Sequence, residues 1–203
     1  MKKIKMIEAA LLCALIISPA VSVGRFYRGC KNVEENVVRL HVIANSDSAS
    51  DQKIKLLVRN AVLNNGAEIF GESSSAEEAL EKLKLKTDEI KKTADETLIG
   101  CGASYRSEAV VGEEYFNTRS YGDITLPAGR YRAVRIILGS GEGHNWWCVM
   151  FPPLCLPAAE KDVPVDAYLD KSGVNVVRSD QGYEIRFKIV EVFEKMRNKV
   201  KDQ

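Results

Sequence analysis

The spacing of apolar residues divides the chain into extended and helical stretches. Residues 36–44 alternate apolar and polar side chains and are rich in β-branched residues, which predicts a strand. Residues 45–48 are turn formers and helix N-caps, so the strand should end there. Apolar side chains then recur at helical spacing over Ile54–Val62, which predicts a helix ending near Gly66 or at Gly71.

The rest of the pattern predicts a second helix, a β-rich middle and a final helix. The second helix should begin at a capping box formed by Ser75 and Glu78 and run toward Gly100. Apolar residues at helical spacing over 189–200 predict the last helix. Three extended segments lie between them, over residues 105–111, 114–118 and 130–138. We therefore expect an α+β single domain, with a mixed or antiparallel sheet and two or three packed helices.

The first 23 residues have the three-part form of a secretory signal. Three lysines stand within the first five positions, an apolar stretch follows over Ile7–Ile17, and small residues occupy 18–22. The apolar stretch is short for a membrane-spanning helix, and Pro19 is expected to interrupt it. We expect residues 1–23 to be a signal peptide or an N-terminal anchor, and residues 24–203 to form the exported α+β domain.

Composition excludes several classes of protein. Charged residues make up 28% and apolar residues 45% of the 203, which is unlike a disordered chain or a polytopic membrane protein. The net charge of +1 gives no electrostatic attraction to DNA or RNA. We therefore expect no nucleic-acid partner, and membrane contact only through the N-terminal segment or a partner protein.

Export changes the expected chemistry of the cysteines. Cys13 lies in the signal segment, which leaves four cysteines for an oxidising compartment. Four cysteines allow three pairings, and the sequence alone does not choose among them. We favour Cys148 with Cys155, because the two prolines between them should turn the chain back on itself, and by exclusion Cys30 with Cys101.

Residues 143–155 are the densest concentration of rare residue types in the chain. The run contains both tryptophans, one of the two histidines, two cysteines and two prolines. We interpret it as a rigid, disulfide-pinned loop that presents aromatic side chains to a partner. A second motif at the predicted strand-to-helix corner should form one composite surface with it. The partner-binding residues predicted from the two motifs are His144, Asn145, Trp146, Trp147, Phe151, Pro152, Pro153, His41, Asn45, Ser46 and Asp47.

Each of these residues has an alternative interpretation. Asn45, Ser46 and Asp47 could simply cap the following helix, and His41 could be an ordinary core histidine. Adjacent residues of an extended segment point to opposite faces, so only one indole readily fills a core. A zinc site formed by the histidines with Cys148 and Cys155 is disfavoured, because the run contains no metal-binding spacing. We expect no metal and no cofactor.

The two motifs resemble one protein family. The run 143–155, the segment Leu40–Asp47 and the exported N-terminus are together similar to stage II sporulation protein R of endospore-forming Firmicutes, over essentially the whole chain. The resemblance implies a signalling protein exported from the forespore into the space between forespore and mother cell. It implies a membrane-embedded sporulation aspartyl protease as partner, which processes the sigma-E precursor. It supplies no catalytic residue set.

We therefore expect a protease activator that is not itself an enzyme. The competing hypothesis is an exported thiol- or histidine-dependent enzyme that acts on the cell wall or a septal substrate, with Cys148 or His144 in the reaction. A third possibility is a scaffold in the septal space.

Overall fold

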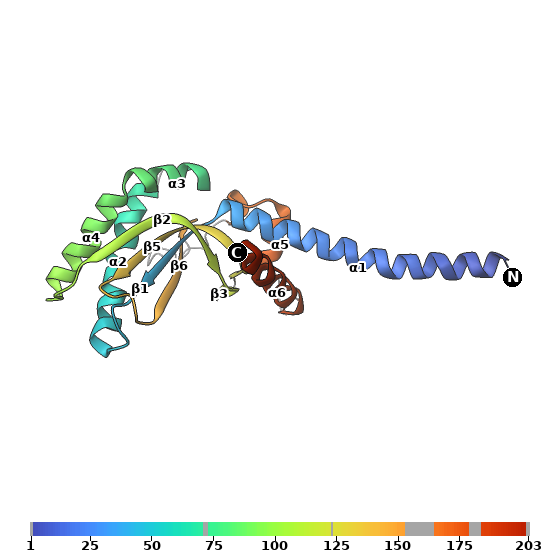
Figure 1. The fold of residues 1–203 in the computed structure, drawn as a ribbon. Coiled ribbons are helices and arrows are strands. Elements are labelled where there is room, and N and C mark those ends of the chain that lie inside the picture. Colours follow the sequence, from blue (N-terminus) through green and yellow to red (C-terminus); the bar gives the residue numbers. More distant parts are fainter. Residues whose placement is uncertain (1, 71–72, 123, 153–164, 179–183, 202–203) are drawn as a thin grey trace. The chain divides into compact units, whose positions relative to one another are not determined.

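The computed structural model describes residues 2–70, 73–122, 124–152, 165–178 and 184–201 (Figure 1). The chain divides into two compact units. We call residues 34–116 and 130–168 the sheet unit, and residues 1–33, 117–129 and 169–203 the helical unit.

The sheet unit contains a four-stranded sheet and the helices that pack on it. Its strands are β1 (Val38–Ile43), β2 (Ser107–Phe116), β5 (Gly129–Leu138) and β6 (Asn145–Phe151). Its helices are α2 (Ala49–Phe70), α3 (Ala76–Leu85), α4 (Thr87–Gly100) and the short 3-10 helix η1 (Val165–Ala167).

Strand β1 lies inside the sheet, between β5 and β6. The strand order is β2-β5-β1-β6, with β1 parallel to β5 and antiparallel to β6. The sheet is therefore mixed, which confirms the predicted α+β class. The antiparallel register sets the two sequence motifs beside each other, with His41 opposite Trp147 and Ile43 opposite Asn145.

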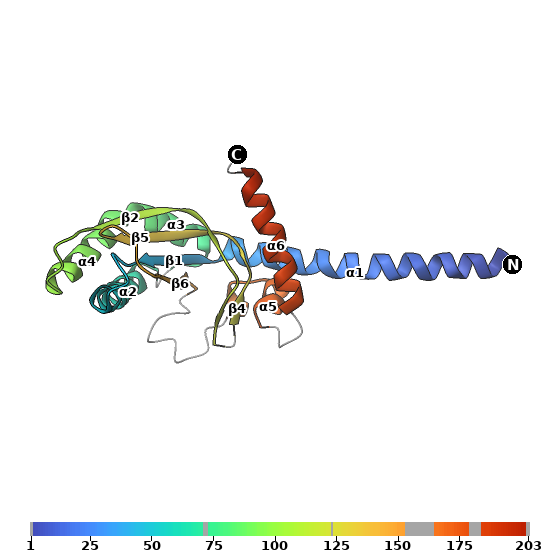
Figure 2. The same cartoon turned by 60° about the horizontal axis from the view of Figure 1, so that its bottom comes forward.

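One face of β1 faces the main hydrophobic core. Val38, Leu40 and Val42 are fully buried and belong to one cluster with apolar residues of α2, α3 and α4. These helices lie next to the strands of the sheet (Figures 1 and 2). Alternation along a strand sends every second side chain to this face. The same cluster takes Val58 from α2 and Leu98 from α4, so the helical spacing predicted from the sequence is confirmed there.

The predicted second helix is two helices. Its capping box is confirmed in part, because the backbone N–H of Glu78 donates to the Ser75 hydroxyl at 3.2 Å, although Glu78 reaches back to Ser74. The break falls at Lys86. There the hydroxyl of Thr87 donates to the carbonyl of Leu83 at 2.9 Å, a local contact that competes with continuous helical bonding.

Two other boundaries also differ from expectation. The segments predicted over 105–111 and 114–118 form the single strand β2, which continues through Gly112. The tryptophan run is not a loop, because residues Asn145–Phe151 form the strand β6. Its unbroken apolar stretch pairs with the buried strand β1, and such pairing satisfies backbone groups that a buried loop would leave open.

The helical unit contains α1 (Lys2–Asn36), α5 (Lys171–Val177), α6 (Glu184–Lys201) and the short antiparallel pair β3 (Arg119–Tyr121) and β4 (Ile124–Leu126). Helix α1 enters the sheet unit with its last three residues. It runs through Pro19 without a break, contrary to expectation. Proline removes one helical hydrogen bond, and the exposed turn around Pro19 leaves the freed carbonyl open to water.

Helices α1 and α6 share a small core. The rings of Phe26 and Phe187 meet edge to face at 5.2 Å, next to buried Cys30 and Val190. Glu194 is fully buried and forms an ion pair with Arg197 at 2.6 Å. This core orders α6 against the C-terminal half of α1.

Over the described residues, no helix combines the length and the apolar character needed to cross a bilayer.

One predicted disulfide is wrong and the other lies outside the described residues. Cys101 is an exposed free thiol at the end of α4, and Cys30 is buried in the core of the helical unit, so the expected Cys30–Cys101 bond is not formed. Pairing by exclusion failed because it assumed that every cysteine is oxidised. Cys155 belongs to the residues that the structure does not describe, so its pairing with Cys148 stays a prediction.

Candidate functional site

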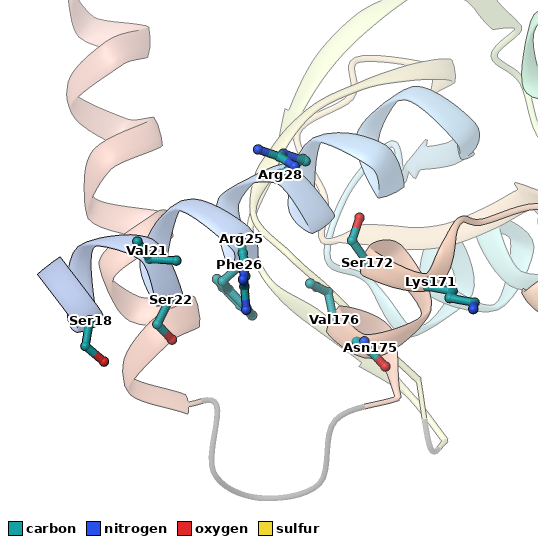
Figure 3. Close-up of a pocket in the computed structure, with 10 residues that line it drawn as sticks. All are labelled: Ser18, Val21, Ser22, Arg25, Phe26, Arg28, Lys171, Ser172, Asn175 and Val176. Atoms are coloured by element: carbon teal, nitrogen blue, oxygen red, sulfur yellow. The ribbon is translucent and has the colours of Figure 1, made fainter.

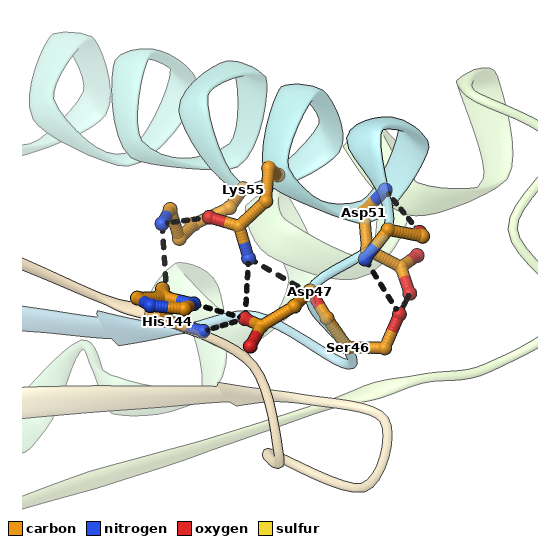
Figure 4. Close-up of polar contacts among 7 residues, drawn as sticks. Ser46, Asp47, Asp51, Lys55 and His144 are labelled. Atoms are coloured by element: carbon orange, nitrogen blue, oxygen red, sulfur yellow. Dashed lines mark hydrogen bonds and ion pairs between the residues drawn. The ribbon is translucent and has the colours of Figure 1, made fainter.

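The two sequence motifs meet where β1 turns into α2. The chain entering β6 runs alongside this corner, and two backbone hydrogen bonds join them, from Gly143 to the carbonyl of Ala44 at 2.9 Å and from Glu142 to that of Asn45 at 3.2 Å. Residues 45–55 and 139–145 therefore form one structure, which we call the corner (Figure 4).

Asp51 holds the interior of the corner together. Its carboxylate is nine-tenths buried and accepts hydrogen bonds from Ser46 at 2.5 Å, Tyr105 at 2.6 Å and Asn45 at 2.9 Å. These bonds stabilise the charged form and lower the pKa of Asp51 to about 2. Burial, and then the bond to Asp51, raise the pKa of Tyr105. The neutral phenol and the charged carboxylate are thus fixed as a donor and acceptor pair.

Asn45 links the corner to the turn between β5 and β6. Its side-chain oxygen accepts from the backbone N–H of Ser140 at 2.9 Å, and its carbonyl accepts from the Ser140 hydroxyl at 2.8 Å. The glycines of this turn allow its backbone to lie this close to the corner. A Cβ added at Gly139 would lie 2.1 Å from the Asn45 side chain, and one added at Gly143 would lie 2.3 Å from the carbonyl oxygen of Ser46.

Helix α2 begins with a cap that none of the predicted site residues provides. The backbone N–H of Asp51 donates to the hydroxyl of Ser48 at 3.1 Å, and Ser48 is the residue just before the helix. Asn45 and Ser46 stabilise the same corner through Asp51 instead. The alternative that Asn45 and Ser46 cap this helix is therefore wrong, because their side chains bond to the Asp51 carboxylate and Ser48 provides the cap.

Asp47 and His144 form the exposed rim of the corner. The backbone N–H of His144 donates to Oδ1 of Asp47 at 2.7 Å, and the Nδ1 atom of its ring contacts the same oxygen. These bonds from His144 lower the pKa of Asp47. The two side chains are nevertheless 79% and 56% exposed for His144 and Asp47. We call Asp47, His144 and the exposed Asn145 the corner surface.

Lys55 supports this surface from the interior of the corner. Its side chain is buried and donates to the backbone carbonyl of His144 at 2.9 Å and to the side-chain oxygen of Gln52 at 2.6 Å. Burial lowers the pKa of Lys55, and the nearby charge of Asp47 opposes that shift. Lys55 therefore fixes the backbone of β6 where it enters the corner surface.

The two tryptophans point to opposite faces of the sheet, as alternation predicts. Trp147 stacks on His41, with ring centroids 3.7 Å apart and planes 15° from parallel, and it meets Phe116 edge to face at 4.9 Å. His41 is buried and its Nδ1 lies 2.8 Å from Oε1 of Glu114. His41 is thus part of an aromatic cluster inside the sheet unit and does not face a partner.

Trp146 lies on the helix-facing side of β6. It packs against the main core, and the guanidinium of Arg59 stands 4.3 Å from its ring centroid. Both indoles are only partly buried. Each makes contacts that support the fold, so neither is the freely presented anchor that the sequence suggests.

The end of the tryptophan run is buried. Phe151 is 2% exposed and meets Tyr168 edge to face at 5.0 Å, and Pro152 is buried as well. The prediction that Phe151 and Pro152 present themselves to a partner is therefore wrong. It failed because the run is a strand that faces the core. Pro153 lies outside the described residues.

Sequence reasoning missed the residues that shape the site. Asp51, Lys55 and Tyr105 are buried or half-buried polar groups that look like surface residues in the sequence. Asp51 and Lys55 are four positions apart at the start of α2, which places them on one helix face. That spacing was the available signal, and nothing in the sequence connects it to Tyr105.

The described residues contain no group of three or more histidine, cysteine, aspartate or glutamate side chains that could hold a metal ion. Cys148 is disulfide-bonded and 1% exposed in the main core, so it offers no thiol to a substrate. The exposed pair of His144 and Asp47 has the arrangement of a base and its orienting carboxylate.

The helical unit holds a separate cavity of about 740 Å³ (Figure 3). Helices α1 and α5 line it with basic, hydroxyl and apolar side chains, among them Arg25, Phe26, Ser172 and Asn175. None of the predicted site residues lies in it.

Comparisons with known proteins find a matching family and a relative. The family described as Stage II sporulation protein R matches residues 34–161. A stage II sporulation protein R of Bacillus subtilis (strain 168) is 41% identical over 123 residues. That alignment covers 61% of this chain and 55% of the relative, so the chain spans about half the length of the relative it matches. The match is narrower than the whole-chain likeness expected from the sequence. No solved structure matches.

Proposed function

Because the chain belongs to the stage II sporulation protein R family, and so has a role in sporulation, we propose that it is an exported signal that activates a protease. The protease is a membrane-embedded aspartyl protease that processes the sigma-E precursor. The signal acts from the space between forespore and mother cell. The signal-like pattern of residues 1–23 supports the export step.

One observation carries the docking part of this proposal, namely that both motifs of the family resemblance contribute residues to the corner surface. Asp47 comes from the first motif and His144 and Asn145 from the second, and all three are exposed. The buried groups beneath them, Asp51 and Lys55, hold their backbone in place. A recognition surface of this kind needs little ordering on binding, because the fold has already fixed it.

The sharpest test removes the corner surface without touching its support. The triple substitution Asp47→Ala, His144→Ala and Asn145→Ala should stop processing of the sigma-E precursor in sporulating cells, followed by immunoblot. Unfolding midpoint and protein level should stay near those of the unchanged protein, because the side chains removed are exposed. Normal processing with the triple variant would refute docking through this surface.

The matched control is another exposed ion pair in the same unit. Lys92 and Glu96 on α4 lie 3.8 Å apart and are 75% and 65% exposed. Replacing both with Ala should leave processing unchanged. If it also stops processing, the effect of the triple variant is not specific to the corner. A photocrosslinker at position 145 should additionally capture the protease, and capture of peptidoglycan alone would favour the scaffold.

The pair of His144 and Asp47 favours a second candidate, a histidine-dependent enzyme. A general base contributes about 10²- to 10⁴-fold to a rate, and glutamine cannot replace it. Glutamine can still donate a hydrogen bond to Asp47. His144→Gln should therefore keep much of the signal if the surface docks, and lose it by about 100-fold or more if His144 is a base. Processing yield at graded expression of the variant distinguishes the two.

A further inference from the structure

Helix α6 has an exposed apolar stripe. Ile189, Val192, Phe193 and Met196 are 50%, 54%, 50% and 57% exposed, and their spacing of three, four and seven residues places them on one side of the helix. Single exposed apolar residues are common on protein surfaces. A continuous stripe of four on one helix indicates a surface that something covers.

The stripe is not needed for packing within the helical unit. Phe187 and Val190, on another side of α6, already bury themselves against Phe26 and Cys30 of α1. Phe193 touches the ring of Tyr27 at 5.9 Å yet stays half exposed. Helix α6 therefore has one apolar side that is used and a second that faces solvent.

The charge of the chain is divided unequally between its two units. The helical unit has 15 lysines and arginines against 8 aspartates and glutamates, whereas the sheet unit has 14 against 20. The whole-chain value of +1 conceals a helical unit of +7 and a sheet unit of −6. A basic unit with an exposed apolar helix face has the two properties that bind an anionic bilayer surface.

We propose that α6 lies on the surface of a bilayer that contains anionic phospholipid, with the stripe of Ile189, Val192, Phe193 and Met196 in the headgroup and acyl boundary. The basic surplus of the helical unit attracts it to the surface, and burial of the stripe retains it there. The residues matched by the family, 34–161, do not include α6. This membrane contact is additional to the N-terminal segment and independent of the proposed protease.

The first test measures binding of the full-length chain to vesicles. The double substitution Val192→Ser and Met196→Ser should weaken binding to phosphatidylglycerol-containing vesicles by about tenfold or more, since two apolar side chains lose their burial. Its matched control is Leu85→Ser with Ile99→Ser, which removes two apolar side chains of the sheet unit that are 85% and 58% exposed. The control should bind as the unchanged chain does. Equal binding by all three chains would overturn the proposal.

The second test separates α6 from the apolar N-terminal half of α1, which could bind vesicles by itself. An environment-sensitive fluorophore is attached at Met196→Cys, in a chain whose exposed Cys13 and Cys101 are replaced by Ser. Its emission should shift to the blue on addition of anionic vesicles and be quenched by lipid-borne nitroxide. The same probe at Lys195→Cys, the neighbouring residue and so turned to another side, should respond weakly.

Three outcomes would contradict the proposal. An unshifted probe at position 196 with bound protein would assign binding to α1 alone. A blue shift in buffer that grows with protein concentration would show that a second copy covers the stripe. If the chain bound purely zwitterionic vesicles as tightly as anionic ones, at low and at high salt, the basic surplus would have no role in binding.

Discussion

Asp47 and Asp51 are four residues apart at one corner and have opposite surroundings. Asp51 is nine-tenths buried and accepts three side-chain hydrogen bonds, whereas Asp47 is 56% exposed and bonds mainly to His144. Both carboxylates have a lowered pKa, so charge state alone does not tell them apart. The two residues differ in the hydrogen-bond donors that a substitution would leave without a partner. Replacing Asp51 would leave three donors unpaired, whereas the groups around Asp47 can bond to water instead.

Under the proposed function, this difference separates residues that stabilise the fold from residues that bind the partner. The interior of the corner fixes the backbone, and the rim offers side chains that the fold can lose. Changes at the interior should therefore reduce stability first and activity only as a consequence. Changes at the rim should reduce activity alone.

The largest effect is expected from Asp51→Ala. It leaves donors on Asn45, Ser46 and Tyr105 without their acceptor, and each such loss costs about 1–3 kcal/mol when the group stays buried. We expect a loss of about 3–5 kcal/mol in the free energy of unfolding, measured by urea denaturation. Tyr105→Phe removes one of the three bonds and should cost about 1 kcal/mol. A loss below about 1 kcal/mol for Asp51→Ala would mean that the interior does not hold the corner.

A smaller loss is expected from Gly143→Ala. The added Cβ would meet the backbone of Ser46 at 2.3 Å, which cannot move aside as a flexible side chain can. We expect a cost of about 1–3 kcal/mol, together with reduced processing of the sigma-E precursor, because the corner surface shifts. Gly112→Ala is the control, since a Cβ there meets nothing within 4 Å. If the two variants unfold at the same urea concentration, the corner tolerates more movement than its contacts indicate.

Acid should weaken the interior within a defined pH window. The pKa of Asp51 falls from 3.8 to about 2 on folding, so its contribution is complete above about pH 4 and is lost as the pH falls toward 2. The unfolding free energy of the unchanged chain should therefore drop more steeply between those pH values than that of Asp51→Asn, which cannot titrate. Parallel pH profiles for the two proteins would contradict the assignment.

The smallest effect on stability is expected from Asp47→Asn. The amide oxygen can still accept from the backbone of His144, and the side chain is exposed, so the unfolding midpoint should hardly change. Precursor processing should nevertheless fall, because the charge presented next to His144 is lost. Thermal unfolding and precursor processing should be measured on the same variant. A fall in both the unfolding midpoint and the processing yield would contradict the contrast between Asp47 and Asp51.

The sequence predicted the elements better than the site. Periodicity identified β1, α2 and α6, because apolar residues recur in each at the spacing of a strand or a helix. The same spacing wrongly predicted one continuous helix across Thr87, whose hydroxyl bonds to the carbonyl of Leu83. It also wrongly predicted a loop where β6 pairs with β1. Both errors concern hydrogen bonds, which apolar spacing does not encode.

Within the site, the sequence indicated that the two motifs belong together, but it placed buried residues of both motifs on the predicted surface. Phe151 and His41 are aromatic and rare in the chain, which made them candidates for contact, yet both are buried. Rarity does not distinguish a partner anchor from a core residue, because both uses favour large rings. The strand register decides between them, and register depends on a pairing partner about a hundred residues away.

That long-range pairing restricts when the corner surface can exist. The bond from His144 to Asp47 joins residues 97 positions apart, and it forms only after β6 has taken its place beside β1. A chain that is still being synthesised, or one threaded unfolded through a membrane channel, has neither half of the surface in its final shape. If the chain is exported as we propose, it would have no docking surface during transit, so no inhibitor would be needed in the compartment where the chain is made.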